Sequence, residues 1–320
     1  MTDSNLRRAL LFHLGVIAVL FALQFILPAY HHTNFARIMV LASYAIGYNI
    51  LVGYTGLMSL GHAMFFAAGL YGAGLTIHYL GIPAPLGFLL GIAAGTLLAI
   101  AVGLVALRTS GVSFMIVTMM LAQACYLLTL YYNAYTRGDE GIVLKPEARR
   151  GLFAGMPFDL SDPAIRFNLA LLLFAVCLFG ALALVRSEFG RVLGAVRETE
   201  ERTRLLGYDT NRYKLLALAA SGAMAGAAGA AYVLLFSYMG STFAAIEYSI
   251  LPLLWVLLGG AGTVIGPFVG TLLMFYIAEF SSDYTSAYKL VVGVVLVLLV
   301  LFFPKGIAGS LRERYAPWLP

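Results

Sequence analysis

Ten apolar runs follow one another along the 320-residue sequence, separated by short stretches rich in Gly, Pro or charged residues. A membrane-spanning helix needs about 20 predominantly apolar residues, so most of these runs are long enough to cross a bilayer. They lack the alternating pattern of a transmembrane β-barrel, and in lipid a helix satisfies its own backbone polar groups. The sequence therefore predicts one all-α domain over residues 1–320, a polytopic transmembrane helix bundle of about 8–10 spans. The runs cover residues 9–28, 35–52, 62–80, 84–107, 112–131, 164–185, 215–237, 248–258, 265–280 and 288–303.

The composition indicates that lipid, rather than water, is the solvent of this domain. Hydrophobic residues make up 61% of the chain and charged residues 11%, whereas soluble domains contain about 45–50% and about 25%. The run at 9–28 is too long for a cleaved signal peptide, so we interpret it as the first span. Cys125 and Cys177 lie inside apolar runs and form no metal-binding pattern, so we expect no metal and no other cofactor.

The distribution of Lys and Arg predicts the orientation of the chain in the membrane. If the N-terminus is cytoplasmic and all ten runs cross, 13 of the 20 basic residues lie on the cytoplasmic side and 7 on the other side. Cytoplasmic loops carry an excess of Lys and Arg. We therefore predict that both termini are cytoplasmic, with an external loop at 132–163, a cytoplasmic loop at 186–214 and a cytoplasmic tail at 304–320. Nucleic-acid binding is not expected, because no basic patch is interleaved with exposed aromatic residues.

Glycines and hydroxyl residues interrupt the apolar pattern after the second run. Such a break exposes backbone polar groups, which at membrane depth are tolerated only against protein or a wet cavity. Discontinuous helices form binding or gating sites in many transporters. We therefore predict that this segment lines a translocation pathway. The alternative is an ordinary turn between two helices, and the histidine of the segment has a packing role as its alternative. The candidate pathway residues are Gly53, Tyr54, Thr55, Gly56, Ser59, Gly61 and His62.

A second glycine-rich segment follows the run at 248–258, which is too short for a normal span. Glycine is a poor helix former, so we predict a short or broken helix here. Two interrupted segments in opposite halves of a chain are typical of transporters with a central path. A nucleotide-binding P-loop is excluded, because G-x-x-x-x-G-K-[ST] requires a Lys that is missing here. The candidate pathway residues of this segment are Gly259, Gly260, Gly262 and Thr263.

Small residues recur every four positions within the run at 84–107. Positions four apart lie on one face of a helix, so this run presents a smooth groove to a neighbouring helix. A second stripe lies at 221–231, and for both we predict tight helix packing. The first stripe consists of Gly87, Gly91, Gly95, Ala99 and Gly103, and the second contains Gly222 and Gly226.

The charged segment 186–214 has apolar residues at roughly helical spacing. We predict a short amphipathic helix across the cytoplasmic face, ended by Gly207. Such a helix binds either anionic lipid headgroups or a soluble protein. The glutamates within 198–201 offset much of the basic charge, which favours a docking surface for a soluble protein. The apolar stripe consists of Val192, Leu193, Val196, Leu205 and Leu206.

Ionisable residues are nearly absent from the predicted spans, so no Asp/Glu/His relay for ion-coupled transport can be drawn. No catalytic motif is present either, and we do not expect an enzyme. Energy for uphill transport would then come from a separate ATPase subunit. A facilitative channel for a small neutral solute and a membrane anchor without a path are the alternatives.

Three motifs, in this order, resemble the signature of bacterial branched-chain amino acid ABC permeases of the LivM type. The resemblance covers about residues 35–303. The first motif is Gly53-Tyr54-Thr55-Gly56 with Ser59-Leu60-Gly61-His62-Ala63; the second is Gly194-Ala195-Val196-Arg197-Glu198 with Leu206-Gly207-Tyr208-Asp209; the third is Leu258-Gly259-Gly260-Ala261-Gly262-Thr263 with Gly266-Pro267.

This resemblance implies the permease subunit of an ATP-driven importer in the bacterial inner membrane. Its implied partners are a homologous second permease, two cytoplasmic ATP-binding subunits and a periplasmic substrate-binding protein, besides membrane lipid. The family usually transports leucine, isoleucine and valine, and related members carry urea, short-chain amides or other small organic acids. The cytoplasmic loop would couple ATP-driven closure to the bundle through Arg197, Glu198, Glu201, Arg202, Gly207 and Asp209.

Overall fold

Each of the ten predicted apolar runs forms a helix in the computed structural model, which describes residues 3–153, 156–285, 287–316 and 318. The predicted all-α membrane bundle is therefore confirmed. The run at 112–131 matches its helix to the residue, because Gly111 precedes the apolar stretch and Tyr131 and Tyr132 close it. The helices are α1 (Asp3–Leu23), α2 (Ala29–Asn49), α3 (Ala63–Leu80), α4 (Ala84–Ala106), α5 (Val112–Tyr131), α7 (Pro163–Arg186), α10 (Thr210–Phe236), α11 (Ile246–Gly259), α12 (Gly266–Tyr284) and α13 (Tyr288–Phe302).

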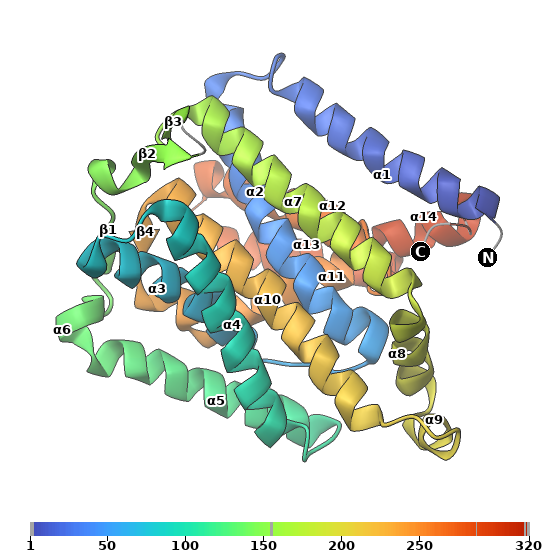
Figure 1. The fold of residues 1–320 in the computed structure, drawn as a ribbon. Helices are drawn as coiled ribbons and strands as arrows, with labels where there is room; N and C mark the ends of the chain where they lie inside the picture. The colour runs from blue at the N-terminus through green and yellow to red at the C-terminus, as the bar shows by residue number, and fades with distance from the viewer. Residues whose placement is uncertain (1–2, 154–155, 286, 317, 319–320) are drawn as a thin grey trace.

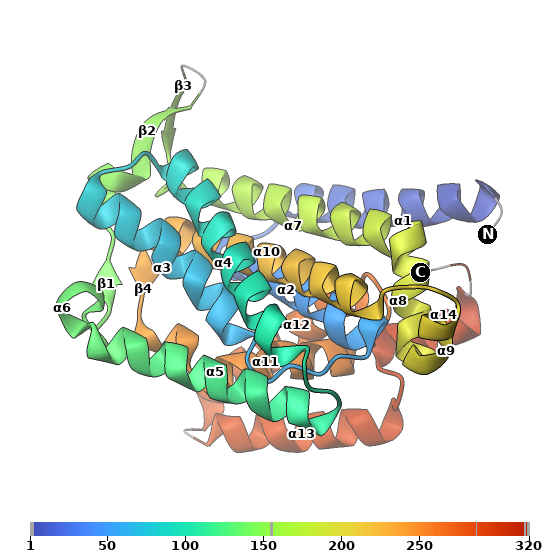
Figure 2. The same ribbon diagram turned by 60° about the horizontal axis from the view of Figure 1, so that its bottom comes forward.

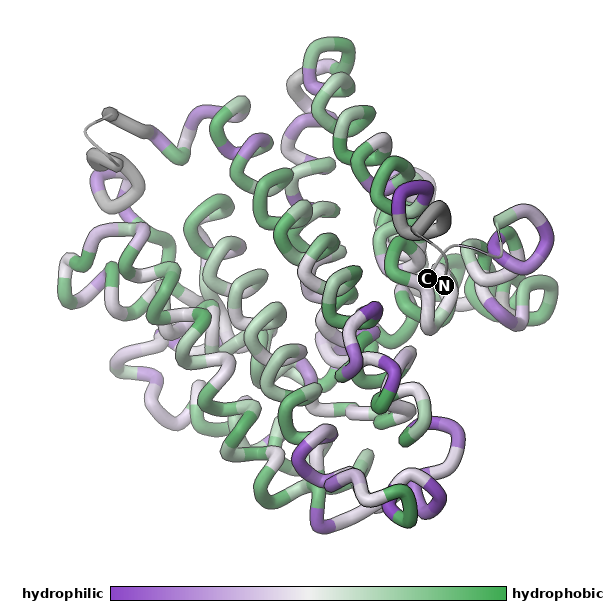
Figure 3. The backbone as a smooth tube through the Cα atoms, turned by 45° about the vertical axis from the view of Figure 1, so that its right-hand side comes forward, coloured by the Kyte–Doolittle hydropathy of each residue, from purple (hydrophilic) through white to green (hydrophobic). Residues whose placement is uncertain are grey.

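Within the described residues, six helices are long and apolar enough to cross a membrane. They are α2 with its continuation to Thr55, and α3, α4, α5, α7 and α10. Helices α11 and α13 are apolar but shorter. The chain is thus a multi-pass membrane protein, and the count of 8–10 spans stays a prediction. Figure 3 shows the apolar colour along the long helices and the hydrophilic colour gathered at their connections.

The helices run between two opposite ends of the molecule (Figures 1 and 2). One end carries the start of α1, the helices α8 (Glu188–Glu198) and α9 (Glu200–Leu205), and α14 (Ile307–Tyr315). The other end carries α6 (Asn133–Thr136) and the four strands found among the described residues. The described parts of the two termini therefore lie at the same end as the predicted cytoplasmic loop. Which end faces the cytoplasm stays a prediction.

The predicted external loop at 132–163 contains short structured pieces. Strand β1 (Ile142–Val143) pairs antiparallel with β4 (Tyr238–Met239), which ties the loop to the end of α10. Strands β2 (Arg150–Phe153) and β3 (Met156–Asp159) form a second antiparallel pair. Residues 154–155 of this loop, and 317, 319 and 320 of the predicted tail, lie outside the described residues.

Helices α3, α4 and α10 cross at glycines in the centre of the bundle. A Cβ on Gly95 would lie 2.7 Å from the Cα of Gly226, and one on Gly69 would overlap the Gly226 carbonyl. Because any side chain here would push the backbones apart, the small residues set how closely the three helices approach. This confirms the packing predicted from the two stripes of small residues.

Candidate functional site

The second span does not end as a regular α-helix. Its last six residues, Ile50–Thr55, form a π-helix that ends at Gly56 in the left-handed conformation, with φ 76°. The Thr55 hydroxyl donates a hydrogen bond to the Ile50 carbonyl at 2.8 Å. A π-helical turn changes the register of the backbone hydrogen bonds, and such turns occur frequently at functional sites. The predicted break after the second run is therefore a π-helix followed by an irregular segment to His62.

The second glycine-rich segment is the turn between α11 and α12. Gly260 and Gly262 both have positive φ, 120° and 78°, which a residue with a side chain rarely adopts. A Cβ on Gly259 would overlap the carbonyl of Gly266, so the two helices come together directly at this turn. The short helix predicted before this segment is observed as α11, 14 residues long.

The two glycine-rich segments, more than 200 residues apart in sequence, touch each other. Asn49 donates from Nδ2 to the Thr263 carbonyl at 2.9 Å, and its Oδ1 accepts the Gly262 N–H at 3.0 Å. A Cβ on Gly53 would lie 2.5 Å from the Gly262 nitrogen, so the contact requires glycine at 53. We call the contact of Asn49 and Gly53 with Gly262 and Thr263 the glycine junction.

Two arginines complete the hydrogen bonding of the glycine junction. Arg197, in α8, donates to the Gly53 carbonyl, and its side chain packs against Gly56. Arg312, in α14, donates to the Gly262 carbonyl at 2.9 Å. Each carbonyl is thereby held by a cationic donor from a helix at the same end of the molecule, and charge-assisted hydrogen bonds are the stronger class.

Three residues of the first segment, Ser59, Gly61 and His62, pack into the core of the bundle. His62 is fully buried, its Nε2 lies 3.0 Å from the Ser221 hydroxyl, and its ring stacks on Tyr44. The Ser59 carbonyl accepts a hydrogen bond from the Tyr48 hydroxyl at 2.7 Å. A Cβ on Gly61 would overlap the backbone of α5. These contacts are those of a tightly packed core.

A continuous series of aromatic contacts leads from His62 toward the end of the molecule that carries the strands. Ring centroids of successive neighbours lie 5.0 to 5.7 Å apart from His62 through Tyr44, Phe66 and Tyr248. Phe243 and Tyr232 continue the series at 5.0 and 4.9 Å. We call these six residues the aromatic column. Its rings pack against one another, and four of the six residues, Tyr44, His62, Phe66 and Phe243, are buried.

The loop at 186–214 differs from the single amphipathic helix predicted for it. Thr199 has extended backbone (φ −156°, ψ 98°) and divides the segment into α8 and α9. Val192, Leu193 and Val196 are buried as predicted, whereas Leu205 and Leu206 are 88% and 76% exposed. The prediction that all five form one packed stripe is wrong, because the break at Thr199 turns the second part of the segment away from the bundle.

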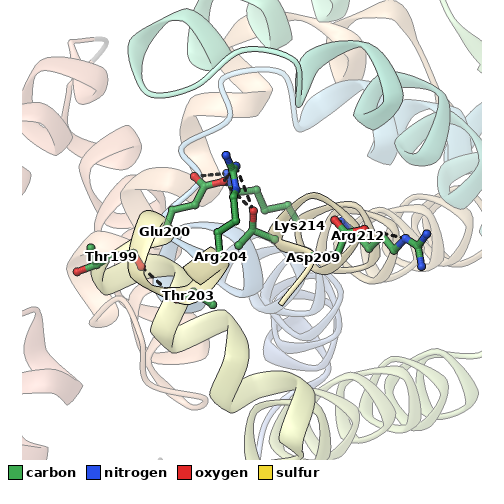
Figure 4. Close-up of polar contacts among 8 residues, drawn as sticks. Thr199, Glu200, Thr203, Arg204, Asp209, Arg212 and Lys214 are labelled. Carbon is green, nitrogen blue, oxygen red and sulfur yellow. Dashed lines mark hydrogen bonds and ion pairs between the residues drawn. The ribbon is translucent and has the colours of Figure 1, made fainter. Parts of the chain in front are cut away.

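A partly buried ion pair fixes α9 to the start of α10 (Figure 4). The Lys214 ammonium, 8% exposed, lies 2.5 Å from the Glu200 carboxylate. Glu200 also accepts from the Thr210 hydroxyl at 3.0 Å and from Arg204 at 3.2 Å. Burial raises the pKa of Glu200, but its bond to Lys214, together with Thr210 and Arg204, outweighs burial and lowers that pKa below its usual value.

The predicted coupling residues thus fall into two groups. Arg197 reaches the glycine junction, and Asp209 caps α10 by accepting the Arg212 N–H at 3.2 Å. Gly207 has φ 90° and turns the chain between α9 and α10. The other three residues, Glu198, Glu201 and Arg202, are exposed on the surface of the loop.

Three residues that build this site are not among the predicted site residues. Asn49 is an amide in an apolar span, which is a signal that it bridges backbone groups. Arg312 lies in the predicted cytoplasmic tail and Lys214 ends the charged segment, and neither pattern singles out one arginine or lysine. Among the described residues, no group of three His, Cys, Asp or Glu side chains is placed to hold a metal ion.

Comparison with known proteins identifies the family. Residues 33–301 match the family described as branched-chain amino acid transport system / permease component. The high-affinity branched-chain amino acid transport system permease protein LivM of Escherichia coli (strain K12) is 31% identical over 298 residues, which cover 86% of this chain and 69% of LivM. LivH of the same organism, also a high-affinity branched-chain amino acid permease protein, is 28% identical over 283 residues, which cover 83% of this chain and 90% of LivH. The chain has a fold of apolar helices, carries the three motifs and matches the family over most of its length. It therefore belongs to the family of branched-chain amino acid transport system permease components.

Proposed function

We propose that this chain is the transmembrane permease subunit of an ATP-driven importer of branched-chain amino acids in the bacterial inner membrane. Its relatives are named as permease proteins of high-affinity branched-chain amino acid transport systems. Both termini and the loop at 186–214 are cytoplasmic in this proposal. The excess of basic residues at the end that carries α8, α9 and α14 supports this orientation.

The proposed partners are a homologous second permease, two cytoplasmic ATP-binding subunits and a periplasmic substrate-binding protein. The match to both LivM and LivH supports a pair of related permeases, because this chain resembles two differently named permease proteins of one organism. The apolar spans of this chain have no ionisable relay for ion-coupled transport, so in this proposal the ATP-binding subunits supply the energy.

The observation that carries the proposal is the contact of Arg197 with Gly53. Arg197 belongs to a charged surface helix, and Gly53 belongs to the π-helix at the end of a buried span. A force on the surface loop is therefore passed directly to the glycine junction. Pulling α8 away removes the donor from the Gly53 carbonyl and leaves a buried polar group without a partner, which favours rearrangement of the π-helix.

The surface of the loop provides the contact for an ATP-binding subunit. Glu198, Glu201 and Arg202 present charges of both signs, and Leu205 and Leu206 present apolar side chains to water. Exposed adjacent leucines bounded by charged residues are typical of a protein contact surface. The partly buried pair of Glu200 and Lys214 holds this surface rigidly on α10, so that movement of the loop is transmitted and not absorbed.

The substrate path proposed here follows the aromatic column, whose packed rings would separate to let a solute pass. An aliphatic side chain gains dispersion and burial against ring faces, and the ammonium of an amino acid is attracted to the same faces. These features support a branched-chain amino acid as the substrate. A related small polar solute, such as urea or a short-chain amide, is the alternative that the uptake assay separates.

Uptake by the complete transporter in proteoliposomes tests the proposal. With ATP inside and binding protein outside, radiolabelled leucine should accumulate, and the chain reconstituted alone should give no accumulation. Arg197→Ala with Glu198→Ala should leave the protein folded and reduce uptake about tenfold or more, because one charge-assisted hydrogen bond to the junction is lost. The control is Arg191→Ala with Glu188→Ala, an exposed pair on the same helix.

Three results would count against the proposal. Leucine accumulation by the lone chain would remove the need for an ATP-binding partner. Normal uptake by the Arg197 and Glu198 variant would remove the coupling role of α8. Uptake of urea or an amide in place of leucine, isoleucine and valine would replace the substrate class.

A further inference from the structure

The helix α14 also contacts the glycine junction. Arg312 donates to the Gly262 carbonyl at 2.9 Å. At the start of the helix, a Cβ on Gly306 would overlap Gly260, and the Gly309 nitrogen would lie 2.7 Å from a Cβ on Gly260. Backbone therefore meets backbone here, and the close approach places the Arg312 guanidinium within reach of the turn between α11 and α12.

We infer that Arg312 is a second positioning residue of the glycine junction, beside Arg197. The helices α8 and α14 act as two clamps that hold this junction closed. Arg197 holds the carbonyl of the first glycine-rich segment and Arg312 holds that of the second. Release of one arginine leaves the other carbonyl held, so the junction opens fully only when both helices move.

The construction of α14 suits a clamp that detaches and reattaches. No residue of this helix is fully buried, and only Ile307 and Ala308 at its start pack against the core of the bundle. Besides the glycine contact and Arg312, its described polar ties include the Lys305 to Glu313 ion pair at 2.5 Å, which is exposed. An exposed ion pair contributes little to stability, so the glycine contact and the Arg312 hydrogen bond are the specific ties between α14 and the junction. Detachment would uncover the turn between α11 and α12 without disrupting the bundle.

This inference rests on the proposed function for its motor, because the partner that moves α14 would be the same ATP-binding subunit that contacts α8. The structural part of the inference, that Arg312 keeps the junction closed, does not depend on transport. The two can therefore be tested separately.

Thiol labelling of the junction tests the clamp. Thr263 is buried, so a thiol at this position in Thr263→Cys reports opening of the turn. The substitution removes the hydrogen bond from the Thr263 hydroxyl to the Gly260 carbonyl, so every variant is compared in the Thr263→Cys background. A membrane-impermeant maleimide is applied to inside-out vesicles that contain the complete transporter without ATP, and labelled peptides are quantified by mass spectrometry. Arg312→Gln should raise the labelling rate at 263 about tenfold, because the loss of one charge-assisted hydrogen bond shifts the opening equilibrium by at least that factor.

Two controls separate clamping from a general loss of structure. Arg314→Gln alters an arginine of the same helix that stacks on Tyr315, and it should leave the rate within about twofold. The native Cys177 is buried in α7 and reports unfolding of the bundle, so its labelling should stay at the parent level in every variant. Arg312→Lys keeps the charge without the planar fork and should raise the rate at 263 by a smaller factor.

The outcomes are decisive in both directions. Faster labelling at 263 alone in Arg312→Gln, with a multiplicative further increase on adding Arg197→Gln, supports two independent clamps. An unchanged rate at 263 would overturn the inference, and so would a parallel rise at Cys177 in both the Gln and the Lys variants. Because the vesicles contain no ATP and no substrate, failure of the proposed transport activity leaves this result interpretable.

Discussion

Removal of Lys214 should release the coupling loop from the bundle. The Lys214 ammonium is 8% exposed and lies 2.5 Å from the Glu200 carboxylate, which is 30% exposed. Breaking a buried pair by removing one partner costs about 3–5 kcal/mol, since the other charge stays buried. Partial exposure of Glu200, and its remaining bonds to Thr210 and Arg204, reduce the expected cost of Lys214→Met to about 2–4 kcal/mol.

This cost applies to the docking of α9, and the transmembrane bundle should remain folded. A change of about 2–4 kcal/mol corresponds to an increase of about 30- to 700-fold in the local opening constant. Hydrogen exchange of the α9 amides measures it directly, because Thr203 and Leu206 donate to carbonyls inside this segment. The same experiment on the amides of α10 should show no comparable change.

The matched control is the pair of Arg191 and Glu188 in α8. These side chains lie 3.4 Å apart but are 73% and 93% exposed, and such pairs contribute about 0–1 kcal/mol. Arg191→Met should therefore change exchange by less than about fivefold. Equal exchange in the Lys214 and Arg191 variants would refute the reasoning. Removal of both charges in Lys214→Met with Glu200→Met should relieve the cost of a buried unpaired charge. A double variant that opens more readily than Lys214→Met alone would therefore also refute the reasoning.

Three further predictions test other parts of the structure. The pKa of Glu200 is lowered in the folded state, so the docking of α9 should be constant above about pH 4.5 and should weaken as the pH falls through the folded pKa. Hydrogen exchange of the α9 amides as a function of pH measures this dependence, and a flat profile would contradict it. Asn49→Leu should lower the free energy of unfolding of the purified protein by about 2–5 kcal/mol, because two backbone groups of the glycine junction lose their partners. An unchanged melting temperature would argue against the bridge. Gly95→Leu should prevent folding or lower the free energy of unfolding by several kcal/mol, because the new side chain forces α4 away from α10. Its control is Gly15→Ala in α1, where the added methyl points into open space and should change stability by less than about 1 kcal/mol. Comparable yields of folded protein from both variants would contradict the packing argument.

The position of every long helix follows from the sequence because each depends on neighbouring residues. An apolar run of sufficient length must close its own hydrogen bonds in lipid, and glycine, proline or charge marks where it stops. The same local reasoning locates both glycine-rich breaks and the helix of the cytoplasmic loop up to Val196. It does not extend to Leu205 and Leu206, because the break at Thr199 is accompanied by the pairing of Glu200 with Lys214, a contact that sequence periodicity does not report.

The sequence by itself determined the membrane class, the ten helical runs, the two broken segments and the family resemblance. Only the tertiary structure showed that the two broken segments meet, that Asn49 joins them, and that Arg197 and Arg312 hold their carbonyls. The physical reason is one of range. Helices form through hydrogen bonds between residues a few positions apart, whereas the glycine junction is specified by how helices far apart in the chain pack together, which no local pattern contains.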